Sequence, residues 1–250
     1  MKEVRYERHL PRDIVERRTA APVAYLAIGG VEWHGEHLAV GNDVLKGHAL
    51  CCRAARLGGG LVMPPLYWGE PRGEEILESG HDHDGRVAEK MSIPKANFGP
   101  GYMRKSHDEE YEFYVQLLLH IFRELDSLEF RVVMVCCGHY PLIHEAREAA
   151  ERFAAESDMR VFPFIGFDLA EDLGYRGDHA GRWETALLMA LEPDLVDLSP
   201  LGEDRSEAPI GVFGDDPRDA SAEFGREAVE AVVQRMVEKA NSLLKEAGSR

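Results

Sequence analysis

Metal-binding side chains are concentrated in one short segment of the chain, between Glu32 and Asp43. The segment directly follows the apolar run 23–28, which indicates a strand. Within its twelve residues, the side chains that can bind a divalent metal are Glu32, His34, Glu36, His37 and Asp43. Carboxylates packed together raise one another's pKa and resist burial unless their charge is neutralised. The segment therefore favours a fold that gathers these groups around a cation at the end of a buried strand.

Apolar runs and amphipathic segments alternate along the rest of the chain. Strands are predicted over 23–28, 61–66, 130–137 and 160–167, and helices over 43–57, 108–128, 143–156 and 222–245. The segment 177–190 begins as a loop and becomes helical near Trp183, and 67–102 has the Gly, Pro and charge content of a long functional loop. In the first helix we expect the inner stripe to be Val44, Leu45, Ala49, Leu50 and Ala54.

This alternation predicts an α/β fold, a three-layer α/β/α sandwich around a mostly parallel sheet. No low-complexity linker interrupts the 250 residues, so we expect a single domain over 1–250. In such sheets the site lies beyond the carboxyl ends of the strands. Both Glu32 and His139 follow a predicted strand, so two separate segments deliver metal-binding groups to the same edge.

Composition narrows the range of partners. The formal net charge of −16 argues against nucleic acid or an anionic membrane as a partner. The cysteines form two adjacent pairs, 51–52 and 136–137, which predicts reduced, buried thiols rather than disulfides. The first eight residues lack an apolar signal region and no run reaches spanning length, so we expect a cytoplasmic protein.

Spacing within the segment supports a metal site. Glu32 and His34 lie two residues apart, so in an extended backbone they point to the same face, and Asp43 can swing back from the start of the next helix. Imidazole with carboxylates suits zinc, manganese or iron(II), and a shared aspartate can bridge two ions. Two other interpretations stay open: Glu32 and Asp43 are solvated loop charges and Asp43 caps its helix, or His34, Asp43 and His139 form the facial triad of an iron(II) oxygenase.

Four segments, taken in order, resemble motifs of the creatininase family of amidohydrolases. Residues 32–38 with Asn42-Asp43 resemble E-x-H-G-x-H-L…D, and 138–140 resemble the G-H turn after a central strand. Residues 179–185 resemble H-A-G-x-x-E-T, and 211–217 with 220–225 resemble the late G-x-x-G-D-P segment. The resemblance extends over most of the chain and implies a divergent member of the family.

The resemblance implies a centre with two divalent ions, zinc, manganese or iron. Glu32, Asp43 and His139 would hold one ion, and His34 and Asp43 would hold the other. The enzyme that gives the family its name has G-H-Y-E-N at the turn and uses that glutamate as a ligand of the second metal. This chain has Pro141 there, which offers no ligand. Glu184 is our candidate replacement, and a site with one firmly held ion is the alternative.

The resemblance also implies hydrolysis of a small cyclic or amide-like substrate. A metal ion lowers the pKa of a bound water to about 7, and the resulting hydroxide can attack a carbonyl. His179 is expected to carry the proton to the leaving group, with Asp178 orienting it or binding substrate. Side chains expected to contact substrate are His37, Tyr140, Trp183 and Arg72.

The loop 68–104 lacks the F-P-G-T pattern usual in the family, so the substrate stays open. Arg72 or Arg104 can bind an anionic or polyhydroxylated substrate, and the roles of His81 and His83 are undetermined. Our first candidate is ring opening of a cyclic polyol ketone of the inosose type. Creatinine or formamide hydrolysis is the alternative, and a non-catalytic metal-binding protein is a third. The resemblance suggests a homo-oligomer such as a hexamer.

Overall fold

A four-stranded parallel sheet forms the centre of the structure, with strand order β2-β1-β3-β4. The computed structural model describes residues 3–72 and 85–247. The strands are β1 (Val23–Ile28), β2 (Leu61–Val62), β3 (Val132–Cys137) and β4 (Arg160–Phe164). Their parallel pairing requires crossover connections, which the helices between them provide.

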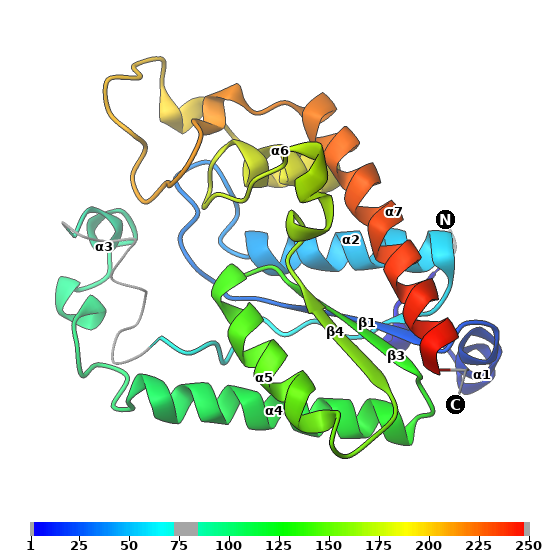
Figure 1. Cartoon of the computed structure of the whole chain (residues 1–250). Helices are drawn as coiled ribbons and strands as arrows, with labels where there is room; N and C mark the ends of the chain where they lie inside the picture. Colours follow the sequence, from blue (N-terminus) through cyan, green and yellow to red (C-terminus); the bar gives the residue numbers. More distant parts are fainter. Residues whose placement is uncertain (1–2, 73–84, 248–250) are drawn as a thin grey trace.

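Helices cover both faces of the sheet (Figure 1). One face carries α2 (Asn42–Gly58), α6 (Arg182–Leu191) and α7 (Ala222–Ala247), and the other carries α4 (His107–Ser127) and α5 (Ile143–Phe153). The predicted α/β sandwich is confirmed. Two further helices are α1 (Pro11–Ala20), beside the start of the sheet, and α3 (Arg86–Lys90), which lies away from it. Short 3-10 turns fall at 6–8, 95–98, 140–142, 168–173, 193–195, 199–201 and 217–219.

The two central strands are buried on both faces, because successive side chains point into different cores. Tyr25 and Met134 pack with residues of α2 and α7, whereas Leu26 and Val135 pack with residues of α4 and α5. This alternation explains why β1 and β3 appear in the sequence as continuous apolar runs.

Several element boundaries differ from the sequence prediction. The strand expected over 61–66 pairs regularly only at Leu61–Val62, because Pro64 and Pro65 cannot donate ladder hydrogen bonds; Leu66 rejoins the sheet through its N–H to Ala27 O. Helix α1 was not predicted, and part of the loop 67–102 folds as α3. The residues His81 and His83 lie outside the described part of the chain.

The strand order reverses between β1 and β3. The chain leaves β1 through α2 to reach β2 on one side, then returns through α4 on the other face to β3 on the opposite side of β1. The ends of β1 and β3 are level, because Ile28 pairs with Cys137. Such a switch point is where parallel α/β sheets form their sites, and the segments carrying Glu32 and His139 both start there.

The cysteines are free and buried, as predicted. Among the described residues, the helices are too short or too polar to cross a bilayer.

Candidate metal centre

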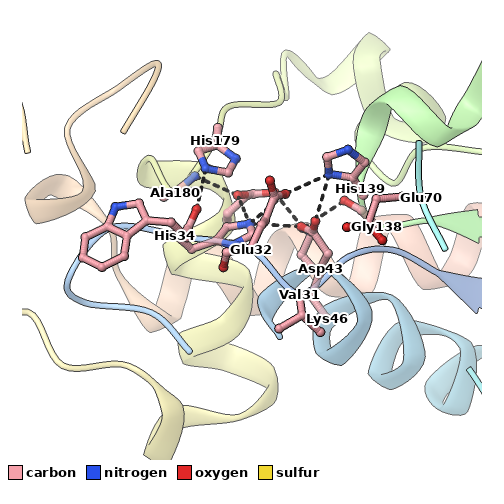
Figure 2. Close-up of polar contacts among 12 residues, drawn as sticks. Val31, Glu32, His34, Asp43, Lys46, Glu70, Gly138, His139, His179 and Ala180 are labelled. Carbon is pink, nitrogen blue, oxygen red and sulfur yellow. Dashed lines mark hydrogen bonds and ion pairs between the residues drawn. The ribbon is translucent and has the colours of Figure 1, made fainter. Parts of the chain in front are cut away.

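Three side chains from separate elements converge beyond the ends of β1 and β3. Glu32 follows β1, Asp43 lies in the first turn of α2, and His139 follows β3 (Figure 2). His139 Nδ1 lies 2.8 Å from Glu32 Oε1 and 3.3 Å from Asp43 Oδ2. Glu32 is 5% exposed and Asp43 1%, so the interpretation of both as solvated loop charges is wrong. Their ligand atoms all lie within 4.8 Å of one another, close enough to bind one ion.

His34 forms a second group with Asp43 and Glu184. Its Nε2 lies 3.1 Å from Asp43 Oδ1 and 3.5 Å from Glu184 Oε2. Its Nδ1 faces the Glu32 carbonyl oxygen at 3.3 Å, which can only accept, so in a neutral ring the lone pair of Nε2 points at the carboxylates. Burial favours that neutral ring, but Asp43, Glu184 and Glu32 raise the pKa of His34 to about 9. A cation, whether a proton or a metal, therefore belongs between these groups.

The start of α6 positions Glu184. The Asp178 carboxylate accepts hydrogen bonds from the backbone N–H groups of Trp183 and Glu184, at 2.7 and 3.2 Å, and so caps the first turn of the helix. Glu184 Oε2 in turn accepts from the N–H of Ala180 at 2.8 Å. Burial, with Glu184 nearby, raises the pKa of Asp178 to about 7. The contacts of Asp178 thus include a structural one that the sequence did not reveal.

Lys46 is a buried cation in direct contact with the cluster. Its Nζ lies 2.6 Å from Asp43 Oδ1 and 2.6 Å from Glu184 Oε1, and donates to the Gly138 carbonyl oxygen at 3.1 Å. Burial opposes the ionisation of both carboxyl groups, but Lys46 and His34 hold the pKa of Asp43 well below its usual range, and they lower that of Glu184 as well.

The atoms around His139 fit a metal ion. Asp43 Oδ2 is buried and accepts no hydrogen bond from the described residues, although it lies beside His139 and on the side of Asp43 facing away from Lys46. A buried carboxylate oxygen without a donor is costly unless a cation approaches it. One imidazole and two carboxylates are hard-to-borderline donors that suit zinc or manganese.

Gly138 lets α2 approach the end of β3. A Cβ atom at this position would lie 2.0 Å from the Asp43 carbonyl oxygen, so any residue other than glycine would clash with it. This close approach brings Asp43 next to His139 and presents the Gly138 carbonyl to Lys46.

His179 stands over the cluster from the loop before α6. Its ring centroid lies 4.5 Å from that of His34, and it shares a possible ligand group with Glu32 and His34. Nε2 lies 2.8 Å from the Trp33 carbonyl oxygen, so Nε2 carries the proton in the neutral ring and Nδ1 keeps the lone pair.

The other residues expected to contact substrate differ in their burial and in the groups that they contact. His37 is buried and hydrogen-bonds Thr185 at 3.0 Å, which ties its segment to α6; burial lowers the pKa of His37 to about 4, so the ring is neutral. Trp183 is 3% exposed and packs against Tyr175 and Phe224. Arg72 pairs with Glu70 and donates to the Val31 carbonyl oxygen.

Tyr140 is nearer to the cluster, with its ring centroid 5.2 Å from Lys46 Nζ. Burial of its hydroxyl, with Glu184 nearby, raises the pKa of Tyr140 well above its usual range. Substrate contact at these four residues stays a prediction. Arg104 is exposed and its backbone has a φ of 61°.

Lys46 is the group that sequence reasoning missed. It lies three residues after Asp43, so the two side chains share one face of α2. That spacing from a predicted ligand was the available signal, but a lysine at the start of a helix is ordinarily solvated.

A buried set of carboxylates and imidazoles at the switch point of a parallel sheet defines this chain as an α/β protein with a candidate divalent-metal centre. The family model for creatininase, described as creatinine amidohydrolase, matches residues 10–77 and 108–240. The chain belongs to the creatininase family, and it is a metal-dependent hydrolase.

Individual relatives agree with this assignment. A creatinine amidohydrolase from Pseudomonas putida is 30% identical over 224 residues, covering 81% of this chain and 78% of that protein. Two solved structures share the fold: a creatininase variant described as Zn-Zn type, with a TM-score of 0.69 and 24% identity, and a structure described as creatininase Mn, with a TM-score of 0.69 and 23% identity. The first comparison covers 97% of this chain and 98% of the other, and the second covers 96% and 98%.

Proposed function

We propose that this chain hydrolyses a small cyclic or amide-like substrate at a carbonyl group, using a divalent ion held by Glu32, Asp43 and His139. The observation that carries the proposal is the convergence of these three side chains, buried and within 4.8 Å, with Asp43 Oδ2 lacking a hydrogen-bond donor among the described residues. Zinc or manganese is the expected ion, because relatives of the same fold are described with these metals. When bound, such an ion polarises a carbonyl and lowers the pKa of a water to about 7.

The proposed proton carrier is His179. Its Nε2–H is fixed by the Trp33 carbonyl oxygen, which orients the ring and leaves the lone pair on Nδ1. Hydrolysis adds a hydroxyl group to the carbonyl carbon, breaks the ring bond to that carbon, and delivers one proton to the departing nitrogen or carbon. We assign His179 the transfer of that proton, with Asp178 supporting the loop through its hydrogen bonds to the start of α6.

Among substrates, a cyclic polyol ketone of the inosose type is our first candidate, and its ring bond would be a carbon–carbon bond. The support is the polar, arginine-bearing sequence of the loop 68–104, because a planar guanidinium suits vicinal hydroxyl groups. The second candidate is a cyclic amide such as creatinine, which the 30% identity to a creatinine amidohydrolase favours.

A substrate screen tests the proposal. The manganese- or zinc-loaded protein is incubated with cyclic amides, formamides and inosose-type ketones in ¹⁸O-labelled water, and products are detected by mass. For a cyclic substrate we expect one product heavier by one water that carries the label, and for a formamide we expect labelled formate with the free amine. Either product should be lost in Glu32→Gln. Oxygen consumption instead of water gain would indicate an iron(II) oxygenase. Metal binding without turnover on every class would favour a non-catalytic protein. The homo-oligomer stays a prediction, which light scattering tests.

A further inference from the structure

We propose that the Lys46 ammonium group occupies the place of a second metal ion, so that the centre holds one divalent ion per chain, on the side of His139. This inference rests on the proposed function, because it concerns the same centre. The centre contains two groups of possible ligands that share Asp43. Glu32 and His139 lie on one side, and His34 and Glu184 lie on the other.

The two oxygens of Asp43 have different surroundings. Oδ1, which faces His34 at 3.1 Å, already pairs with Lys46 Nζ at 2.6 Å. Oδ2, which faces His139 at 3.3 Å, accepts no hydrogen bond from the described residues. The carboxylate therefore has a cation on its first oxygen and a place for one on its second.

Glu184 is occupied in the same way. Its Oε1 pairs with Lys46 at 2.6 Å, and its Oε2 accepts the N–H of Ala180 at 2.8 Å. Each oxygen of the proposed replacement ligand thus has a donor within the protein. A metal ion bound to either oxygen would have to displace or share that donor.

Lys46 is also fixed in place. An ammonium group has three donors, and Asp43, Glu184 and the Gly138 carbonyl oxygen supply three acceptors, at 2.6, 2.6 and 3.1 Å. The side chain is 4% exposed and extends from the buried face of α2. Removing it from the cluster would leave a charge with no route to solvent, which is strongly unfavourable.

Formal charge agrees with a single ion. With the His34 and His139 rings neutral, Glu32, Asp43 and Glu184 contribute three negative charges and Lys46 contributes one positive charge, so the buried cluster carries −3 + 1 = −2. One divalent ion balances that charge. A second divalent ion beside the ammonium would leave a buried excess of positive charge, which a low-dielectric site disfavours.

The test is the number of ions bound, measured by native mass spectrometry and elemental analysis after saturation with manganese and removal of free metal. We expect about one ion per chain in the wild type, and about two in Lys46→Met, because the substitution frees Asp43 Oδ1 and Glu184 Oε1 to act as ligands. Lys105→Met, which removes the same charge from an exposed lysine paired with Glu109, is the matched control and should bind about one.

Electron paramagnetic resonance of the manganese-loaded wild type gives a second readout that does not depend on the folding of the variant. We expect the hyperfine pattern of an isolated ion. A spin-coupled pair with two ions in the wild type would overturn the role of Lys46 and leave the hydrolase proposal intact. A wild type that binds no ion would overturn both. A folded Lys46→Met protein that still binds one ion would show that Lys46 does not exclude a second.

Discussion

At the scale of single residues, the function depends on how Asp43 divides its carboxylate. Helix α2 begins beside the end of β3, so one aspartate can face a lysine of its own helix and a histidine of another segment. Because the carboxylate is buried, neither oxygen can turn to water, and each oxygen keeps the group that it faces. The residues on the His139 side should therefore control metal affinity.

We predict that Glu32→Gln weakens manganese or zinc binding at least about 100-fold, more than the roughly 10–100-fold cost typical of removing a residue that only supports a ligand. The amide keeps the shape of the side chain but cannot supply the anionic oxygen. Isothermal titration calorimetry measures the effect. Glu36→Gln is the matched control, since Glu36 is exposed in the same segment and pairs with Lys90. Equal affinities in both variants would exclude Glu32 as a ligand.

Much of the site could be predicted from local spacing, and the part that could not involves contacts between distant segments. The strand before Glu32 and the strand before His139 placed both residues at one edge of the sheet. Lys46 could not be predicted as buried, because the inner stripe of α2 was assigned to apolar residues alone. Leu45 and Ala49 of that stripe are only half-buried, whereas Asp43 and Lys46 lie on the buried face. The segments that face the start of α2 carry a polar cluster, so charged residues are favoured at these buried positions where apolar residues are usual.

At the scale of elements, α6 depends on Asp178 for its start and on Gly225 for its contact with α7. Periodicity predicted α7, because its buried residues recur at three and four. The start of α6 was expected near Trp183, but six consecutive residues of that helix are buried, so it shows no such spacing. Periodicity did not predict α1, which has no buried residues, and it extended β2 through prolines that cannot continue a ladder. The hydrophobic pattern therefore identified the elements that build the core. It failed for α1, which buries no residue, and for the end of β2, where the prolines have no N–H to donate.

Asp178→Ala should lower the free energy of unfolding by about 0.5–2 kcal/mol, the usual cost of losing a helix cap. The reason is the loss of the acceptor for the N–H groups of Trp183 and Glu184. Urea denaturation measures it. An unchanged free energy with reduced turnover would instead assign Asp178 to catalysis alone.

Gly225→Ala should destabilise the protein by about 1–3 kcal/mol, the usual cost of overpacking. A Cβ atom at Gly225 would lie 1.8 Å from the Ala186 carbonyl oxygen, so α6 and α7 would have to separate. Gly47→Ala is the matched control within α2, where the added atom would meet Ala27 and Cys136 at an ordinary 3.5 Å. There the gain in helix propensity should leave stability equal or higher, by up to about 1 kcal/mol. The same loss in both variants would contradict the packing argument.

At the scale of the whole molecule, the centre ties together both central strands, α2 and α6. The ligand groups come from segments more than a hundred residues apart, so an ion that binds them stabilises the entire fold. We predict that manganese or zinc at about 100 times its Kd raises the free energy of unfolding by about 2.7 kcal/mol. For a chain of this length that corresponds to roughly 2–4 °C in Tm per kcal/mol.

Differential scanning calorimetry with metal and with EDTA measures this stabilisation. Glu32→Gln should lose the metal-dependent part of Tm, whereas Glu36→Gln should keep it. A Tm that is insensitive to metal in the wild type would contradict a centre that joins these elements.

The central claim, that Glu32, Asp43 and His139 hold a divalent ion, is tested most directly by anomalous diffraction from crystals grown with zinc. We predict one strong anomalous peak at about 2.0–2.2 Å from His139 Nδ1 and from oxygens of Glu32 and Asp43. No peak at this position, in crystals that show zinc elsewhere, would contradict the account.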